Sequence, residues 1–166
     1  AWTNNGNVGF TGIQVSVGST IASLVKGNTI QNISLAGTGY TGFYGIATSF
    51  GLVIIDSNLV GHASIANSIY TTGGTVSGGA QIIGILNNSN VASVTSNNTV
   101  ANITSSTSPS NVNPYVIGIY SSVTISNNTI YNLSCNAASY TIAAAPVGIL
   151  SANSTTSQSI NNNTIY

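Results

Sequence analysis

Charge is almost absent from this sequence of 166 residues: Lys26 and Asp56 are its only fully charged side chains, His62 is its only imidazole, and it has no Glu, Arg or Met. A chain with one lysine cannot neutralise a run of phosphates, which excludes charge-driven binding of DNA or RNA. One carboxylate cannot supply the paired acid and base, or the nucleophile with its base and orienting group, that hydrolases use. We therefore expect no enzyme activity and no cofactor.

Cysteine and long apolar runs are equally scarce. Cys135 is the only cysteine, which excludes an intramolecular disulfide, and we expect it to fill a small buried or half-buried space. One Cys, one His and one Asp at unrelated spacings predict no metal site. The longest apolar stretch, residues 52–55, is too short to cross a bilayer, so we expect no membrane insertion. The sequence begins with neither Met nor a signal-like segment, as expected of a processed chain or of an excerpt from a longer one.

Small polar and strand-forming residues take the place of charge. Ser, Asn and Thr occupy 68 of the 166 positions, and 42% of the residues are hydrophobic, mostly Ile, Val and Ala. This mixture favours strands over helices, and its apolar share is too large for a disordered linker. We expect a single domain over residues 1–166, with a neutral surface that favours self-association because no charge repulsion keeps copies apart.

Two motifs repeat along the chain. A heptapeptide of the form Asn-Thr-(Ile/Val)-x-Asn-(Ile/Leu)-(Ser/Thr) occupies residues 28–34, 98–104 and 128–134, residues 57–60 keep a degenerate version, and residues 163–166 begin a further copy. A Gly-Ile motif recurs in step with it, and its glycines lie 33, 39, 34 and 30 residues apart. These glycines are Gly12, Gly45, Gly84, Gly118 and Gly148.

Five units of roughly 34 residues follow from the two motifs. Each unit holds short apolar runs at fixed offsets, separated by Asn, Ser and Gly, and helical periodicity is absent. Such a pattern predicts an all-β fold, a parallel β-helix (β-solenoid) of about five coils in which each strand pairs with its equivalents in the neighbouring coils. We expect Ile, Val and Leu inside the solenoid and Ser and Thr outside.

The repeated asparagines and glycines have expected structural roles in this fold. Asn tolerates the left-handed backbone of a sharp corner, and stacked Asn amides can form a hydrogen-bonded ladder at the strand spacing of about 4.8 Å. We expect one ladder of Asn28, Asn58, Asn98, Asn128 and Asn163, and a second ladder of Asn32, Asn102 and Asn132. The glycines before Ile are expected where a side chain would obstruct the packing of coils.

Stacking also predicts one ion pair. Lys26 and Asp56 each lie two residues before a ladder asparagine, so they should meet on neighbouring coils, where a surface pair contributes about 0–1 kcal/mol. Eight Asn-x-Ser/Thr sequons are candidate glycosylation sites: Asn32, Asn87, Asn97, Asn102, Asn127, Asn132, Asn153 and Asn162. A sequon whose side chain is buried in a ladder would not be available for modification.

Both ends of the sequence fall within a repeat, so we expect uncapped coils with exposed strand edges. Such edges pair with copies of the chain end to end, which gives a fibre because the contact does not close on itself, or with flanking repeats. Loop tyrosines form a candidate aromatic stripe for weak contacts with glycans, and they are Tyr40, Tyr44, Tyr70, Tyr115 and Tyr140.

The repeat resembles the right-handed parallel β-helix repeats of large secreted surface proteins of Bacteroidetes-type bacteria. Residues 116–134, VIGIYSSVTISNNTIYNLS, carry the resemblance most clearly, and it extends over nearly the whole chain. It implies an extracellular or cell-surface adhesin or fibre component, although the C-terminal sorting domain of that family is absent from this sequence. The sequence departs from β-helix enzymes such as pectate lyases and polygalacturonases, which use clustered Asp, Lys and Arg.

We therefore expect a structural extracellular protein, a β-solenoid subunit or segment of a surface filament or adhesin that stacks head to tail. An alternative function is an ice-binding or polysaccharide-binding β-helix module, which would need a flat threonine array. Thr29, Thr99, Thr129 and Thr164 recur once per coil, but the second coil breaks the row and no paired column follows. An alternative fold is a strand-exchanging β-sandwich pilin with residues 1–17 as its donor strand.

Overall fold

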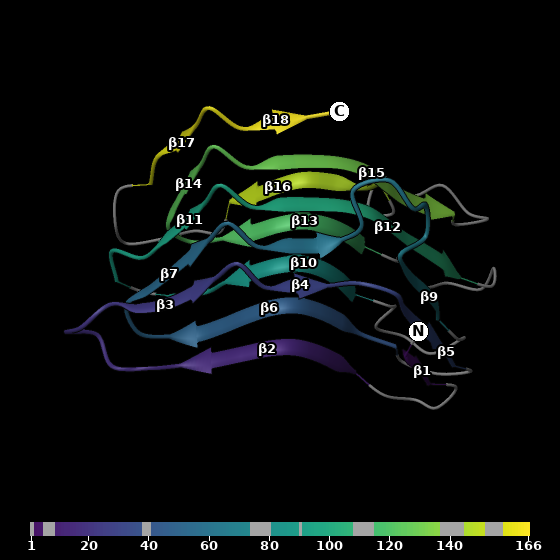
Figure 1. Ribbon diagram of the computed structural model, residues 1–166, viewed down its shortest axis with the longest axis horizontal. Helices are drawn as coiled ribbons and strands as arrows, with labels where there is room; N and C mark the ends of the chain where they lie inside the picture. The colour runs from purple at the N-terminus through teal and green to yellow at the C-terminus, as the bar shows by residue number, and fades with distance from the viewer. Residues whose placement is uncertain are drawn as a thin grey trace.

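Parallel strands stacked along one axis make up the protein (Figure 1). The computed structural model describes residues 2–4, 9–37, 41–73, 81–89, 91–107, 115–136, 145–151 and 158–166. Within these residues no helix is long and apolar enough to cross a membrane. The predicted all-β parallel solenoid is confirmed.

Three parallel sheets form the walls of the solenoid. Sheet A contains β1 (Trp2–Asn4), β4 (Thr29–Ile30), β5 (Ile33–Ala36), β8 (Leu59–Gly61), β9 (Ile69–Gly73), β12 (Thr99–Thr107), β15 (Thr129–Asn136) and β18 (Thr164–Ile165). Sheet B contains β2 (Phe10–Ser16), β6 (Phe43–Phe50), β10 (Gln81–Asn87), β13 (Tyr115–Ser121) and β16 (Val147–Ser151). Sheet C contains β3 (Ser23–Lys26), β7 (Val53–Asp56), β11 (Val94–Ser96), β14 (Thr124–Ser126) and β17 (Ile160–Asn161).

Each coil visits sheet B, then sheet C, then sheet A, and every strand pairs in parallel with the equivalent strand of the next coil. Sheets B and C each stack five strands, and five stacked strands span about four full turns of about 34 residues. Each of the five Gly-Ile motifs lies on one strand of sheet B. The number of motifs is therefore the number of strands in that sheet, and the chain makes about four full turns between the first strand and the last. Strands β1 and β2 belong to parallel sheets of the solenoid, so the β-sandwich pilin with a donor strand in residues 1–17 is wrong.

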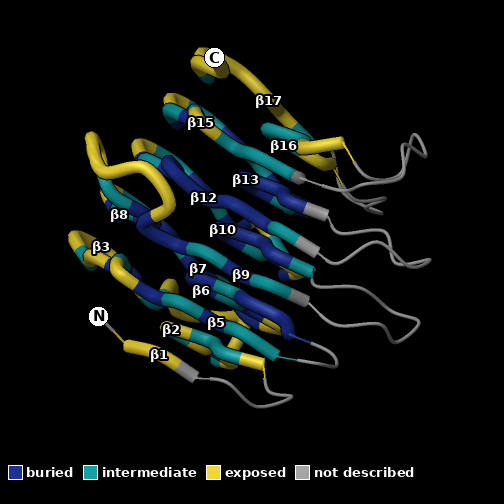
Figure 2. The backbone as a smooth tube through the Cα atoms, turned by 90° about the vertical axis from the view of Figure 1, so that its right-hand side faces the viewer, coloured by how far each residue is buried: buried dark blue, intermediate teal, exposed yellow. Residues whose placement is uncertain are grey.

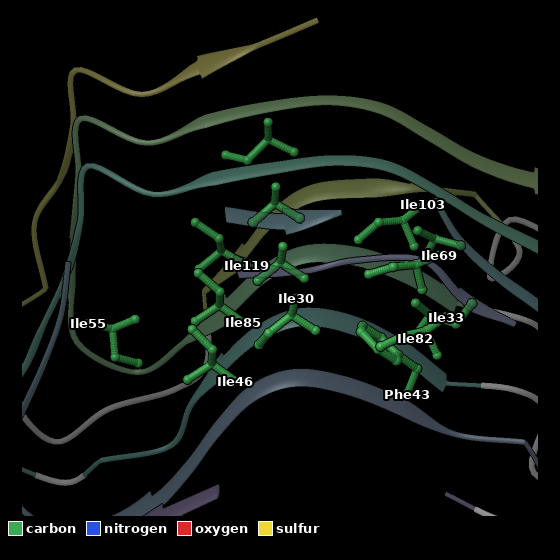
Figure 3. Close-up of a cluster of buried hydrophobic side chains, with 14 of the residues drawn as sticks. Ile30, Ile33, Phe43, Ile46, Ile55, Ile69, Ile82, Ile85, Ile103 and Ile119 are labelled. Atoms are coloured by element: carbon green, nitrogen blue, oxygen red, sulfur yellow. The ribbon is translucent and has the colours of Figure 1, made fainter. Parts of the chain in front are cut away.

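Like residues stack on like in the core. Ile46, Ile85 and Ile119 are in register on consecutive strands of sheet B and are completely buried (Figure 3). A second column in sheet A includes Ile33 and Ile69. A fully buried Ile contributes about 1.5–3 kcal/mol by removing apolar surface from water. The repeat thus places a continuous apolar column inside the coils, as the sequence predicts.

Small polar side chains replace the hydrophobic core near the end of β10. Asn87 is completely buried, accepts a hydrogen bond from Thr48 Oγ1 at 2.7 Å and donates one to Thr95 Oγ1 at 3.0 Å. Ser93 Oγ donates to Ser89 Oγ at 2.8 Å. Among the described residues, every buried side-chain nitrogen and oxygen has a hydrogen-bond partner. The cluster therefore avoids the penalty of a buried unsatisfied polar group.

An insertion interrupts the regular path of the second coil. The register offset to the first coil is 30 residues between β4 and β8 but 36 residues between β5 and β9, so residues 62–67 are six extra residues. They form an exposed loop beside β8 (Figure 2). We call residues 62–67 the side loop. It accounts for most of the excess in the 39-residue spacing between Gly45 and Gly84.

Candidate functional site

The asparagines of the first predicted ladder lie one above another where sheet C turns into sheet A. The backbone N–H and the side-chain Nδ2 of each asparagine both donate to Oδ1 of the asparagine in the next coil, at 2.9–3.0 Å. The ladder joins Asn28, Asn58, Asn98, Asn128 and Asn163. Its three central members are 1–2% exposed, so these hydrogen bonds are shielded from water.

This asparagine ladder has a direction. From Asn28 to Asn128, each backbone N–H and one Nδ2–H donate toward the C-terminal end of the solenoid, and the Oδ1 atoms from Asn58 to Asn163 accept from the N-terminal side. From Asn58 onward, Nδ2 also donates to a carbonyl oxygen of the preceding coil. Among the described contacts, no donor reaches Asn28 Oδ1 and no acceptor meets the backbone N–H of Asn163. The first coil therefore presents an acceptor and the last coil presents a donor.

The left-handed corner belongs to the residue before each ladder asparagine. Gly27, Ser57, Asn97, Asn127 and Asn162 have φ of 53–68°. We expected the motif asparagines themselves to take this conformation, and for the first ladder that expectation is wrong. The amides of the ladder are held by hydrogen bonds, whereas the preceding residue makes the turn and is exposed.

The second predicted ladder is only partly assembled. Asn32, Asn102 and Asn132 all have left-handed backbone at the second corner, with φ of 51–59°. Asn132 Nδ2 donates to Asn102 Oδ1 at 3.1 Å, but Ser68 takes the equivalent place in the second coil and its Oγ accepts from the Asn32 backbone N–H at 3.2 Å. The side loop moves the left-handed residue to Asn67, which leaves serine in the column. The ladder therefore breaks at Ser68.

The motif glycines lie where a side chain would strike the next coil. A Cβ atom added to Gly84 would lie 2.5 Å from Val100 Cγ1 and 2.6 Å from the carbonyl oxygen of Gly118. A Cβ on Gly118 would meet the same two kinds of neighbour, the side chain of Ile130 and the carbonyl oxygen of Gly148. A Cβ on Gly148 would meet the side chain of Ile165. Gly12 and Gly45 are equally confined. Each glycine thus makes room for the Ile or Val that fills the centre of the coil.

Lys26 and Asp56 form an ion pair between neighbouring coils, with 2.9 Å between Nζ and Oδ2. The Asp56 side chain is 13% exposed and also accepts hydrogen bonds from Asn97 Nδ2 at 2.7 Å and Ser96 Oγ at 3.2 Å. The Asn97 amide and the Lys26 ammonium hold the pKa of Asp56 well below its usual range. Because Lys26 is 55% exposed, solvent screens the pair, and we assign it about 1 kcal/mol at most.

His62 closes the side loop. Its Nδ1 accepts hydrogen bonds from the backbone N–H groups of Ser64 and Ile65, both at 3.0 Å. The loop lies against later coils, because Tyr131 OH donates to the carbonyl oxygen of Ala63 at 2.7 Å and Asn102 Nδ2 donates to that of His62 at 2.5 Å. Burial and the neighbouring Tyr166 raise the pKa of the Tyr131 phenol. These contacts hold the side loop in place. The repeats in the sequence did not predict them.

The sequons divide into exposed and enclosed sites. Asn32, Asn97, Asn127, Asn132 and Asn162 are exposed at the two corners. Asn87 is completely buried and Asn102 is 4% exposed under the side loop. Asn153 lies outside the described residues. The enclosed pair cannot carry a sugar in the folded protein.

The described residues form no regular aromatic or threonine array on the surface. Thr29, Thr99, Thr129 and Thr164 share one outward column of sheet A, but Leu59 interrupts it. Of the loop tyrosines, Tyr44 lies on sheet B and Tyr70 on sheet A, so they do not form one stripe, and Tyr115 is the first residue of β13. Tyr40 and Tyr140 lie outside the described residues.

The two ends of the solenoid have different shapes. At the C-terminal end, β18 pairs with β15 only at Thr129 and Ile130, and an open cavity of about 350 Å³ follows, lined by residues that include Leu133, Pro146 and Ile165. We call the outer side of β16, β17 and β18 the C-terminal face. On this face, Ile160 is 49% exposed and Ile165 is 55% exposed.

The N-terminal end has one extra strand in sheet A. Strand β1 pairs with β5 through Trp2 and Ile33 and therefore lies one coil beyond it. Trp2 is 45% exposed, and its ring contacts Phe10 at 4.9 Å, which in turn stacks on Phe43 at 5.8 Å. We call the outer side of β1, β2, β3 and β4 the N-terminal face. In the described part of the chain, each of these strands is paired along one edge only.

Cys135 is half-buried in register with Ser105, and burial raises the pKa of its thiol, as fits the expected filler. The described residues contain no group of three His, Cys, Asp or Glu side chains placed to hold a metal ion. Comparison with protein families, curated proteins and solved structures found no match.

Proposed function

We propose that this chain is a structural β-solenoid, a subunit or a segment of an extracellular filament or adhesin stalk whose coils continue from one unit to the next. The stacking of equivalent strands in three parallel sheets along one axis supports this proposal most directly. Each coil contacts mainly the coils beside it, so the array can be extended by further coils of the same kind.

The chemistry of the surface favours the same role. The net charge is zero, so no electrostatic repulsion opposes the stacking of units. The lysine, the aspartate and the histidine of the chain all make structural contacts: Lys26 and Asp56 pair with each other, and His62 holds the side loop. We therefore infer a structural rather than a catalytic role.

An extracellular or cell-surface location is part of the proposal. The resemblance of the repeat to secreted surface proteins supports it, and so do the exposed sequons at the corners, which suit a glycosylated or glycan-contacting surface. Digestion of intact source cells with a protease tests the location. Loss of the protein from undisrupted cells is expected, and full protection until the cells are broken would contradict an exposed position.

Electron microscopy of the native material tests the structural role. Unbranched rods are expected, with an axial repeat of roughly 24 Å for each unit of five stacked strands at the sheet spacing of about 4.8 Å. The rods should lengthen with protein concentration, since the contact does not close on itself. Discrete particles at every concentration, in native material as well as after purification, would refute the filament role.

A further inference from the structure

We propose that the side loop and the outer face of sheet A form a binding site for a neutral sugar unit. The site is a cavity of about 470 Å³, a size typical of small-molecule sites. The side loop, which projects beside β8 (Figure 2), forms one wall, and β12 and β15 form the floor. The residues that line the cavity include Ala66, Asn67, Asn102, Thr104, Asn132 and Ser134. This inference goes beyond the structural role and does not depend on it.

The floor of the cavity belongs to the interior of sheet A. Thr104 lies between Ile103 and Ser105, which are both completely buried, so the alternation of the strand turns Thr104 outward. Thr104 is in register with Tyr70 of β9 on one side and with Ser134 of β15 on the other. Strand β12 is therefore paired along both edges at this point, and the cavity is a feature of the outer surface.

Contacts from two later coils hold the wall of the cavity. Asn102 Nδ2 donates to the carbonyl oxygen of His62 at 2.5 Å, and Tyr131 OH donates to that of Ala63 at 2.7 Å. The imidazole of His62 in turn accepts two backbone N–H groups of the loop, both at 3.0 Å. Because the side loop is tied both to the sheet and to itself, the cavity is formed before a ligand arrives.

The hydroxyl of Thr104 indicates that the cavity takes a ligand. Thr104 is only 6% exposed, yet its Oγ1 makes no hydrogen bond in the part of the chain that the structure describes. Every fully buried side-chain nitrogen and oxygen of the described residues has a partner, so this hydroxyl opens into the cavity that it lines. A hydroxyl both donates and accepts, and a nearly enclosed one gains a full partner from a ligand hydroxyl.

Two asparagine amides complete the set of groups available to a ligand. The side chain of Asn67 makes no hydrogen bond among the described contacts. Asn132 Nδ2 donates to Asn102 Oδ1 at 3.1 Å, whereas Asn132 Oδ1 accepts nothing from the described residues. Asn102 uses both ends of its amide within the protein, so it positions Asn132 and the side loop. An amide offers a donor and an acceptor side by side, which suits adjacent hydroxyl groups of a sugar.

The lack of charge around the cavity selects the class of ligand. Every described residue that lines it is uncharged. A phosphate, carboxylate or ammonium group would therefore lose hydration without gaining an opposite charge. An apolar ligand would leave the Thr104 hydroxyl and the asparagine amides without partners. A neutral molecule with several hydroxyl groups satisfies them.

Saturation-transfer NMR with neutral glycosides tests the site. The method observes the ligand, so it applies to single chains and to rods alike. The protein is made in a host that adds no sugars, because Asn132 begins a sequon. The probes are the methyl pyranosides of glucose, mannose and galactose, and at least one should bind with a Kd on the order of 1 mM. Binding of none of them, or binding of phosphate or acetate in their place, would overturn the proposal.

Two pairs of variants locate the binding. Thr104→Val keeps the shape of the side chain and removes the hydroxyl. Asn67→Gly removes the amide and keeps a left-handed corner that glycine adopts without strain. Each should weaken binding at least about tenfold. The matched controls are Thr99→Val, on the same strand but outside the cavity lining, and Asn127→Gly, at an exposed left-handed corner, and both should bind as the wild type does.

A rescue separates contact with the ligand from a role in folding. Thr104→Ser restores a hydroxyl and should recover most of the binding that Thr104→Val loses. Equal weakening by a variant and its control, or a Thr104→Ser chain that binds no better than Thr104→Val, would overturn the proposal. Sugar binding and rod formation are measured separately, so this site and the filament role can each fail while the other stands.

Discussion

Replacing Asn98 by alanine should destabilise the solenoid far more than the same change at Asn28. Asn98 is 1% exposed and its side chain makes four hydrogen bonds: Oδ1 accepts from the backbone N–H and from Nδ2 of Asn58, and Nδ2 donates to Asn128 Oδ1 and to the carbonyl oxygen of Ile55. The change leaves the N–H of Asn58 buried without an acceptor, which costs about 1–3 kcal/mol, and removes bonds worth about 0.5–1.5 kcal/mol each. The expected total loss is about 3–5 kcal/mol.

Asn28→Ala is the matched control in the same column. The Asn28 side chain donates to Asn58 Oδ1 at 3.0 Å and to the carbonyl oxygen of Lys26 at 3.2 Å, and no described N–H depends on its Oδ1. It sits at the end of the ladder with access to water, so its loss should cost about 1 kcal/mol. Both free energies of unfolding are measured by urea denaturation, followed by circular dichroism, at a concentration where the chain is monomeric. Losses that agree within about 1 kcal/mol would refute the reasoning that ladder stability depends on buried, doubly accepting amides.

Three further predictions concern the glycine column, the ion pair and the sequons. Gly84→Ala should cost at least about 1–3 kcal/mol of unfolding free energy because its Cβ would meet Val100 Cγ1 at 2.5 Å, whereas Gly18→Ala, with nothing within 4 Å, should change little; equal urea midpoints would contradict the packing role. Since the folded pKa of Asp56 is lowered, its contribution of up to about 1 kcal/mol is present above the unfolded pKa of about 3.9 and is lost as the pH falls through the folded value. Asp56→Asn should therefore lower the urea midpoint at pH 7 but reduce its loss on acidification, and identical acid profiles would argue against this. Folded protein secreted from a glycosylating host should carry sugar at the exposed Asn127 but none at the buried Asn87, and mass spectrometry that finds the reverse would contradict the assigned burial.

Repetition made the fold and the first ladder predictable from sequence. In a solenoid, residues at the same place in the repeat lie in the same column, so spacing alone aligned Asn28 with Asn58 and Lys26 with Asp56. The Gly-Ile motif identified the crowded positions for the same reason. A glycine that recurs at one place in the repeat indicates a position where two segments of backbone pack too closely for a side chain, and this can be read from a single sequence.

The parts that escaped prediction depend on contacts between unlike residues. Ser57 takes the left-handed corner where other coils use asparagine or glycine, so residue type did not reveal which member of the Asn-Asn pair turns the chain. The side loop shifts the register by six residues and breaks the second ladder at Ser68, and no repeat marks it. The hydrogen bond from Tyr131 to Ala63 spans 68 residues between dissimilar segments, which periodicity cannot foresee.

The axial direction of the hydrogen bonds has a mechanical consequence. Backbone bonds between coils and the amides of the asparagine ladder all run along the solenoid axis, so a force applied along that axis loads them end-on and concentrates on the outermost coil. A coil of about 34 residues that peels away releases roughly 115 Å of extended chain at about 3.4 Å per residue. Stretching the protein between its ends should therefore give a series of small, evenly spaced extensions instead of one abrupt rupture. A stalk built this way would yield one coil at a time and absorb work with each step.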